Sequence, residues 1–219
     1  MTQTRAQANT DVKPRHSGGR SRDLAKDRAI LDAAHRCFFD NGFARTTMEE
    51  VAQVAGVSKV TVYSRFADKG VLFEGVVAAQ MARMGEALDG EGAKDAPLED
   101  RLNAFGVALL TFLFDRDHVA MKRMLAVEFI TMPALARRFY EAGPGTCRER
   151  LASVLADYAA RGEIMLTDHY YGAESLLSIW KGFDDIRLEF GLIDGLPPEV
   201  IAEKVRRGTT VFLSMVREG

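Results

Sequence analysis

The sequence predicts an all-α protein, and three observations support this. Apolar residues recur at helical spacing along most of the 219 residues, and no stretch shows the clear two-residue alternation of a strand. No hairpin dipeptide lies between β-branched runs, and Gly and Pro fall mainly between the periodic segments. Because 47% of the residues are hydrophobic, a chain of this length can bury a substantial core.

The first expected helix runs from Asp23 to Asn41 and ends at a turn, Asn41-Gly42-Phe43. A second helix begins with a capping box at residues 47–50, in which the Thr47 hydroxyl accepts from the Glu50 amide and Glu50 reaches back. Its apolar positions follow the spacing i, i+3, i+4, i+7, and Gly56 permits a sharp C-terminal stop. Residues 47–66 therefore predict two short helices around a tight turn, as in a helix-turn-helix.

The second helix of this motif begins at Ser58, which can cap it, and its inward positions are Val62 and Phe66. Its outward positions hold hydrogen-bonding side chains: Ser58, Lys59, Thr61, Tyr63 and Arg65. A helix of this kind fits the major groove of DNA, where short polar side chains reach base edges and flanking ones hold phosphates. Lys59 and Thr61 are the best candidates for base edges. Ser58, Tyr63 and Lys69, which follows the capping residue Asp68, are candidates for the phosphate backbone.

A helical hairpin with a Gly turn is common in all-α proteins, so the motif alone is also compatible with plain structure. The order of elements around it is more specific: FFDNGFARTTMEEVAQVAGVSKVTVYSRFADKGVLF resembles the TetR family of transcriptional regulators over about 50 residues, from Asp23 to Phe73. The resemblance implies a three-helix DNA-binding head, a larger helical body for ligand binding and dimerisation, and repression relieved by a small molecule. By position it assigns DNA contacts to Thr47, Lys59, Thr61, Tyr63 and Lys69. Val60 stands where some relatives have Gly, Pro or an aromatic residue, so base preference does not transfer.

The charge of the chain is divided unevenly. Residues 1–70 hold 12 Lys and Arg against 8 Asp and Glu, whereas the whole chain has a net charge of -2. Most of the excess lies in residues 1–22, which we expect to form a disordered basic tail. One role for this tail is a solvated extension, and another is additional phosphate neutralisation or a minor-groove contact. The expected organisation is this tail, a DNA-binding domain over residues 23–70 and a ligand-binding and dimerisation domain over residues 71–219.

Beyond the head we expect helices near 69–88, 98–113, 117–131, 133–161 with a break at residues 143–145, 168–191, and 198–217. The last two carry apolar seams, comprising Gly172, Leu176, Ile179, Phe183, Ile186 and Phe190 in one helix and Ile201, Val205, Gly208, Phe212 and Met215 in the other. Such seams suit helix bundles and can be buried within one subunit or against another. Together with the resemblance they favour a twofold homodimer with a four-helix interface, which would read an inverted-repeat operator in double-stranded DNA.

The middle helices are rich in flexible and aromatic apolar residues, which are candidates for the wall of a ligand pocket or for plain core. They are Met81, Met84, Phe105, Leu109, Phe112, Met121, Met124, Leu125 and Glu128. Glu128 lies on an otherwise apolar face, so it should have an Arg partner, a ligand group or a position at an edge, and an ion pair is favoured. The run EFITMPALARRFYEAGPGT resembles the AefR-like group of C-terminal domains, which suggests control of efflux or stress-response genes.

Two other classes of function stay open. The body can dock a protein partner instead of a small molecule, and Asp115, Asp117 and His118 form a compact cluster that an enzyme could use. A solvated loop in which Asp117 caps a helix explains that cluster better. Cys37 and Cys147 lie far apart and fit reduced packing residues. We expect no catalytic residues, cofactor or metal, and a cytoplasmic protein, because neither a signal peptide nor a membrane-spanning apolar stretch is visible.

Overall fold

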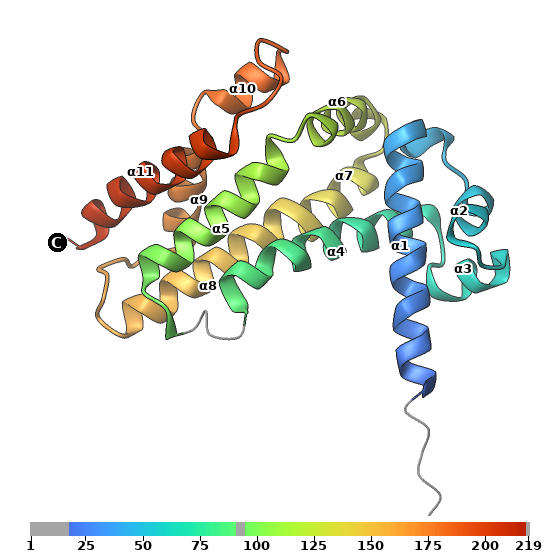
Figure 1. The fold of residues 1–219 in the computed structure, drawn as a ribbon, viewed down its shortest axis with the longest axis horizontal. Coiled ribbons are helices and arrows are strands. Elements are labelled where there is room, and N and C mark those ends of the chain that lie inside the picture. The colour runs from blue at the N-terminus through green and yellow to red at the C-terminus, as the bar shows by residue number, and fades with distance from the viewer. Residues whose placement is uncertain (1–17, 91–94, 218–219) are drawn as a thin grey trace, which may run out of the picture.

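The computed structural model describes residues 18–90 and 95–217, and every regular element within these ranges is a helix (Figure 1). The head contains α1 (Gly18–Arg45), α2 (Met48–Ala55) and α3 (Lys59–Arg65). The body contains α4 (Lys69–Asp89), α5 (Leu98–Leu113), α6 (Arg116–Thr131), α7 (Pro133–Tyr140), the π-helix η2 (Glu141–Gly145), α8 (Thr146–Ala160), α9 (His169–Lys181), α10 (Asp184–Glu189) and α11 (Pro198–Arg217). The all-α expectation is confirmed for the described residues.

The head follows the local signals of the sequence. Thr47 caps α2 by accepting from the Glu50 amide at 3.2 Å, and Gly56 ends the helix in the left-handed region at φ 67°. The Glu50 carboxylate does not reach back to Thr47 as a capping box requires, because Oε1 accepts from Nδ2 of Asn41 at 2.7 Å. Gly42 leaves the helical region at φ 79° and ψ 165°, so it interrupts α1 at the turn expected there, and a short second segment leads to Arg45.

The structure describes only part of the expected basic tail. Residues 1–17 lie outside the described residues, so the structure does not address their predicted disorder or contact with DNA. Residues 18–22 belong to α1, which begins five residues earlier than the sequence pattern indicates. The helical head therefore starts at Gly18 and not at Asp23.

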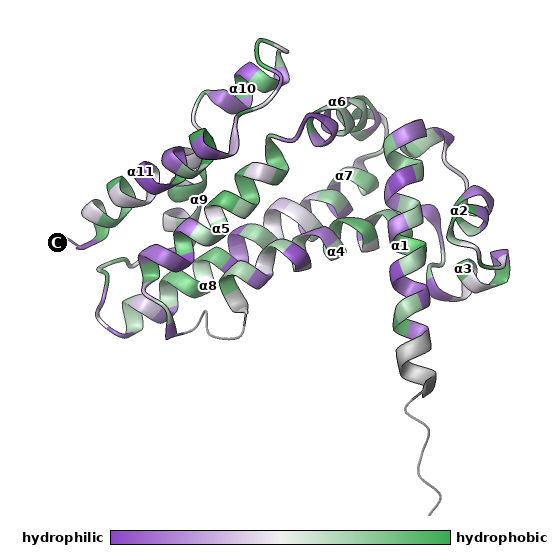
Figure 2. Cartoon of the chain, in the orientation of Figure 1, coloured by the Kyte–Doolittle hydropathy of each residue, from purple (hydrophilic) through white to green (hydrophobic). Residues whose placement is uncertain are grey.

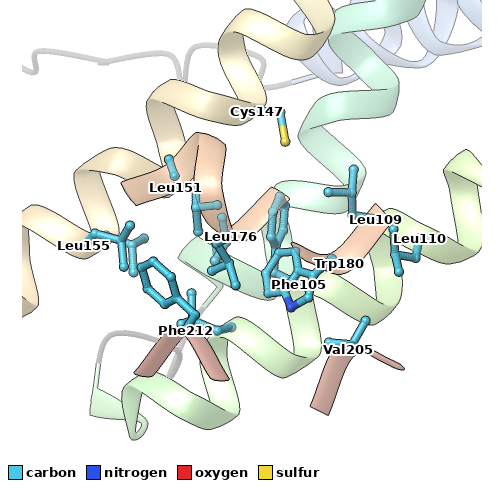
Figure 3. Packing of buried hydrophobic residues seen from close by; sticks show 14 of the residues in the cluster. Phe105, Leu109, Leu110, Cys147, Leu151, Leu155, Leu176, Trp180, Val205 and Phe212 are labelled. Carbon is cyan, nitrogen blue, oxygen red and sulfur yellow. The ribbon is translucent and has the colours of Figure 1, made fainter. Parts of the chain in front are cut away.

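The body is held by one large apolar core between α4, α5, α8, α9 and α11. Trp180 is its largest fully buried side chain, and Nε1 of this indole donates to Oγ1 of Thr209 at 3.1 Å. Figure 3 shows Trp180 beside Phe105 in the centre of this cluster, with Leu176 and Phe212 on one side and Val205 on the other. Because the indole N–H has a partner, its burial does not leave an unsatisfied donor.

Two helix boundaries differ from the expected ones. The expected break at residues 143–145 is instead the π-helical turn η2, through which the chain continues from α7 into α8. Pro144 lacks an N–H, and a locally widened turn accommodates it within the helix. The expected helix 168–191 is divided at Gly182, whose φ of 52° and ψ of -146° end α9 before α10 begins.

The apolar seams predicted for the dimer are also corrected. Leu176, Ile201, Val205, Gly208 and Phe212 are buried in the core of their own chain, so these residues are unable to face a partner. The first seam is not continuous, because the break at Gly182 separates Leu176 from Phe183, Ile186 and Phe190. Ile179 is partly buried, whereas the four remaining apolar members of the seams are exposed: Phe183, Ile186, Phe190 and Met215.

Head and body share part of their cores. Leu125 of α6 and Leu135 of α7 are buried together with the apolar residues of α1, α2 and α4. In Figure 1, α1 crosses the end of the body beside α4 and α6, and Figure 2 shows hydrophobic residues where these helices meet. The two parts are therefore not connected by α4 alone.

Within residues 18–90 and 95–217 the structure has no helix of the length and apolar character needed to cross a membrane.

Replacing Gly208 with Ala tests the packing of α11. The added Cβ would lie 2.8 Å from Cδ1 of Trp180 and 3.0 Å from Cγ2 of Ile179. Overpacking costs about 1–3 kcal/mol. The gain in helix propensity is about 1 kcal/mol, so the cost is larger over most of this range. We expect Gly208→Ala to lower the free energy of unfolding by about 1 kcal/mol in urea titrations followed by circular dichroism. The exposed control Thr210→Ala should change it by less than about 0.5 kcal/mol, and equal stability of both variants would contradict the close packing.

Candidate DNA-binding helix and ligand cavity

The helix-turn-helix places most of the predicted DNA-contacting residues on α2 and α3. Ser58 caps α3, and its Oγ accepts from the Thr61 amide at 3.1 Å and lies 2.8 Å from Oγ1 of Thr61. Val62 is the buried anchor that fixes α3 against the head core. Thr47, Ser58, Lys59 and Tyr63 are exposed, and Thr61 is half-buried.

One strongly exposed side chain of α3 is apolar. Val60 has 77% of its surface exposed, between Lys59 and the partly engaged Thr61. Lys59 forms an ion pair with Glu49 of α2, and its Nζ lies 5.5 Å from the ring centre of Tyr63. Glu49 therefore holds the Lys59 ammonium beside the tyrosine, and the pairing raises the pKa of Lys59.

Two basic side chains of the motif have other partners than the sequence suggests. Arg65 was expected to point outward, but its guanidinium bonds Asp23 at 2.7 Å and also pairs with Asp27, which ties α3 to α1. The ammonium of Lys69 donates to the carbonyl oxygens of Ala44 and Thr46, both at 2.9 Å.

Lys69 also lies 4.6 Å from the ring centre of Phe43, and burial lowers its pKa. Its hydrogen bonds satisfy backbone carbonyls at the end of α1. Lys69 therefore has a structural role within the head, and its predicted phosphate contact stays a prediction.

A cavity of about 260 Å³ lies where the head meets the body. It is lined by residues of α1, α4, α5, α6, α7, η2, α8, α9 and α10, and its wall is mostly apolar. The lining residues are His35, Phe38, Phe73, Val76, Val77, Gln80, Met81, Leu109, Phe112, Leu113, His118, Met121, Lys122, Phe139, Gly143, Pro144, Cys147, Leu177, Lys181 and Asp185. This volume is close to the lower limit of small-molecule sites, about 300–1,000 Å³.

Four of the predicted pocket residues line this cavity: Met81, Leu109, Phe112 and Met121. Met84 and Phe105 instead border a separate void of about 10 Å³. Met124 is exposed, and Leu125 is buried in the core shared with the head. The helical spacing identified the correct helices, but it did not show which turn of each helix faces the cavity.

Glu128 does not line the cavity and has no Arg partner among the described residues, so the expected ion pair is corrected. Its Oε1 accepts from the Ala44 amide at 3.0 Å, and its Oε2 is buried without a hydrogen-bond partner in the described part of the chain. The carboxylate opposes the effect of burial on Lys69 by raising the pKa of that ammonium. Glu128 therefore joins α6 to the end of α1.

The sequence analysis missed the cavity residues contributed by α1 and by the start of α4. His35 and Phe38 lie on α1, and Phe73, Val76 and Val77 lie on the first turns of α4. They carry an ordinary helical pattern of apolar residues, so no signal in the sequence distinguishes them from core. Only the docking of α1 against the body brings them to the cavity wall.

His118 is a buried titratable group of the cavity wall. It is 9% exposed, and its ring lies 4.0 Å from that of Phe112, measured between centres. Burial, and then the nearby Lys122 ammonium, lowers its pKa to about 4, whereas Asp115 and Asp185 oppose this shift. The imidazole is therefore neutral at pH 7.

The cluster that an enzyme could use has a structural explanation in this fold. Oδ1 of Asp115 accepts from the backbone amides of Asp117 and His118, both at 3.0 Å, and so caps α6. The cap is Asp115 and not Asp117, because α6 begins at Arg116. Cys147 is also buried at the cavity, and burial raises the pKa of its thiol to about 11, so it stays protonated and a poor nucleophile.

Acidification tests the burial of His118. Its folded-state pKa of about 4 lies below the ordinary value of 6.5, so the unfolded state takes up the proton first. Stability is lost as the pH falls from about 6.5 towards 4, and no loss is expected above 6.5. Between pH 7 and pH 5 the free energy of unfolding should fall by about 2 kcal/mol more in the wild type than in His118→Phe. Parallel pH profiles of the two proteins in urea titrations would contradict this.

Comparisons with known proteins agree with this arrangement. The family described as bacterial regulatory proteins of the tetR family matches residues 30–76, and the C-terminal domain of AefR-like transcriptional repressors matches residues 100–215. The structure of the flavonoid-responsive regulator FrrA is 31% identical, with a TM-score of 0.68, and the match covers 88% of this chain and 97% of that one. A Mesorhizobium loti protein described as a TetR-family transcriptional regulator is 27% identical, with a TM-score of 0.71 and coverage of 90% and 98%.

Among curated relatives, an HTH-type transcriptional repressor of Mycobacterium tuberculosis is 34% identical over 68 residues, or 31% of this chain. This match spans only 36% of the length of that relative. The two family matches together cover the head and the body. The chain therefore belongs to the TetR family of transcriptional regulators, with a DNA-binding N-terminal domain and an AefR-like C-terminal domain.

Proposed function

We propose that this regulator is a homodimeric repressor that binds an inverted-repeat operator and leaves it when a small, largely apolar molecule fills the cavity. One observation carries the proposal: residues of both the head and the body line this cavity. His35 and Phe38 of α1 face it, as do Leu109 of α5 and Leu177 of α9. A molecule in this position would touch the DNA-binding head directly.

The cavity supports release by a ligand because its head wall belongs to the helices that position α3. A ligand shifts an equilibrium only when it binds one conformation better than the other. Phe38 and Phe73 pack on the head core as well as lining the cavity, so a ligand that displaces these rings would tilt α1 and α4 together. The separation of two heads in a dimer would change, and with it the affinity for the operator.

The DNA-facing surface proposed for α3 combines Lys59, Val60 and Tyr63. A single recognition helix makes few contacts, and two heads related by twofold symmetry enter successive major grooves about 34 Å apart. Val60 offers an exposed branched side chain, and a contact of this type recognises the methyl group of thymine. Thr47 and Ser58 lie beside it at the N-termini of α2 and α3, where backbone N–H groups favour phosphate.

The proposed dimer uses the exposed apolar residues of the last helices in place of the buried seams. Val200, Val211 and Met215 are exposed and share one face of α11, because they are spaced by 11 and 4 residues. Phe183 and Phe190, at the two ends of α10, are 79% and 74% exposed. Large apolar side chains gathered at one end of a chain mark an interaction surface.

A response to a small molecule is also supported by the relative FrrA, whose name describes it as flavonoid-responsive. The alternative, a body that docks a protein partner in place of a ligand, would need no apolar cavity between the head and the body. The cavity of about 260 Å³ therefore favours the ligand.

Binding to the DNA upstream of its own gene tests the regulator. We expect Lys59→Ala/Tyr63→Ala to weaken selective binding roughly 10- to 100-fold, because both contacts lie at the reading surface. It should also make the salt dependence shallower. The matched control Arg137→Ala/Tyr140→Ala removes an exposed basic and aromatic pair from α7 and should bind like the wild type. The proposal fails if the wild type binds scrambled DNA as tightly as its own DNA, if the double variant binds as tightly as the wild type, and if a random-library selection yields no preferred site.

Sedimentation equilibrium tests the dimer surface. The wild type should have the mass of two chains, and Val211→Glu/Met215→Glu should have the mass of one, because two charges would have to be buried in the interface. Ile130 is 81% exposed and lies on α6, not on α10 or α11, so Ile130→Glu should remain a dimer. A monomeric wild type would refute the proposed dimer, and a dimeric double variant would place its interface elsewhere.

A further inference from the structure

The backbone of Ala44, at the end of α1, is held by charged side chains from two helices of the body. Its N–H donates to Oε1 of Glu128 on α6 at 3.0 Å, and its carbonyl oxygen accepts from Nζ of Lys69 on α4 at 2.9 Å. The same ammonium donates to the carbonyl oxygen of Thr46 at 2.9 Å. Hydrogen bonds with one charged partner are stronger than those between neutral groups. Both polar groups of Ala44 are therefore fixed by the body.

This contact lies at the entrance to the helix-turn-helix. Gly42 interrupts α1 shortly before Ala44, and Thr47 caps α2 shortly after it. Thr46 is 1% exposed, and its hydroxyl bonds the carbonyl oxygens of Cys37 and Gly42 at 2.9 and 2.8 Å. Because α2 and α3 follow this fixed segment directly, the position of Ala44 relative to the body helps to set the position of α3.

The helix that carries Glu128 also borders the cavity. Met121 and Lys122 of α6 line the cavity, and Glu128 lies about two helical turns beyond Met121. Between them, Leu125 is buried in the core shared with the head. Apolar packing of this kind is not directional, whereas the hydrogen bond from Ala44 constrains both a distance and an angle. α6 therefore connects the cavity wall to the entrance of the helix-turn-helix through a directional contact.

Stability of the fold does not explain a glutamate at this position. Oε2 of Glu128 is buried and has no hydrogen-bond partner in the described part of the chain. An unpaired buried acceptor is unfavourable, and an apolar side chain of similar size would avoid it. Burial lowers the pKa of Lys69, and the Glu128 carboxylate counteracts this effect, so the two charges are close enough to interact. The carboxylate thus provides an oriented contact that is not the most stable choice for the site.

We infer that Glu128 is a positioning residue for operator recognition: through Ala44 it fixes the angle between the helix-turn-helix and the body, and with it the separation at which two heads meet DNA. The inference rests on the proposed function in requiring two heads on one inverted repeat. Glu128 lies on α6 and not on the reading surface of α3. A change at Glu128 should therefore alter the spacing of half-sites that the protein accepts and leave the reading of each half-site intact.

Selection from a random library of double-stranded DNA, followed by titration of the selected site with its spacer lengthened or shortened by one base pair, tests this inference. One base pair turns the second half-site by about 35° around the DNA axis. We expect the wild type to lose about tenfold in affinity for each such change, and Glu128→Leu, which has no acceptor for the Ala44 N–H, to lose about threefold or less. Both proteins should bind DNA with a single half-site equally.

Two further variants separate the contact from a general effect of the substitution. Glu128→Gln keeps an oxygen that can accept from the Ala44 N–H, so it should restore at least part of the spacing discrimination. The control Glu149→Leu removes an exposed glutamate from α8 and should behave like the wild type.

Hydrogen exchange at the Ala44 amide, followed by NMR on the same full-length preparations without DNA, tests the contact itself. The amide should exchange slowly in the wild type and in Glu128→Gln, and about tenfold faster in Glu128→Leu, because only the last variant lacks an acceptor.

The remaining outcomes each overturn the inference. Unchanged spacing discrimination in Glu128→Leu would show that the contact does not position the head. Equal weakening on paired and single half-sites, with a lower urea midpoint, would show that Glu128 only stabilises the fold, and unchanged exchange of Ala44 would remove the contact. If the wild type still selects an inverted repeat, these results leave the proposed function standing. If it selects none, the proposed function fails and the inference fails with it.

Discussion

The structure depends on a chain of phenylalanine rings that joins the head to the body. Phe38 and Phe43 of α1 are 5.6 Å apart, each lies 5.4 Å from Phe73 of α4, and Phe73 continues to Phe139 of α7 at 6.1 Å and through it to Phe129 of α6 at 5.1 Å. Aromatic pairs at these distances add to the burial of their surface. Because each ring contacts rings from another helix, the head cannot change its orientation without repacking α6 and α7.

The same arrangement explains why the cavity is suited to control. Packed interfaces tend to have discrete alternatives and do not deform continuously, so a small displacement at one ring is transmitted to the next. Phe38, Phe73 and Phe139 belong both to the ring chain and to the cavity wall. Glu128 and Lys69 reinforce this junction at its edge through hydrogen bonds to the backbone of Ala44. A ligand that contacts these rings therefore acts on the joint between DNA binding and the body.

Local structure was largely predictable from the sequence, because it depends on neighbouring residues. The cap at Thr47, the stop at Gly56 and the cap at Ser58 all occur where the side-chain types indicate. Prediction was less successful wherever a residue's partner is distant in the sequence. Arg65 and Lys69 are basic, as DNA-contacting residues often are. However, Arg65 pairs with acidic groups of α1, and Lys69 donates to a backbone carbonyl of α1. Gly208 fits the pattern of a dimer seam, but the residue that packs closely against it is Trp180 of the same chain.

The sequence by itself determined the all-α class, the helix-turn-helix and the family, because periodicity, caps and turn residues are encoded within a few turns of helix. The tertiary structure alone decided which apolar faces are buried in the chain and which remain for a partner, since the helical pattern is the same for both. It also decided that α1 lines the cavity and that Nδ1 of His118 is buried without a hydrogen-bond partner in the described part of the chain. Those properties arise from contacts between helices that are remote in sequence, and no local pattern specifies them.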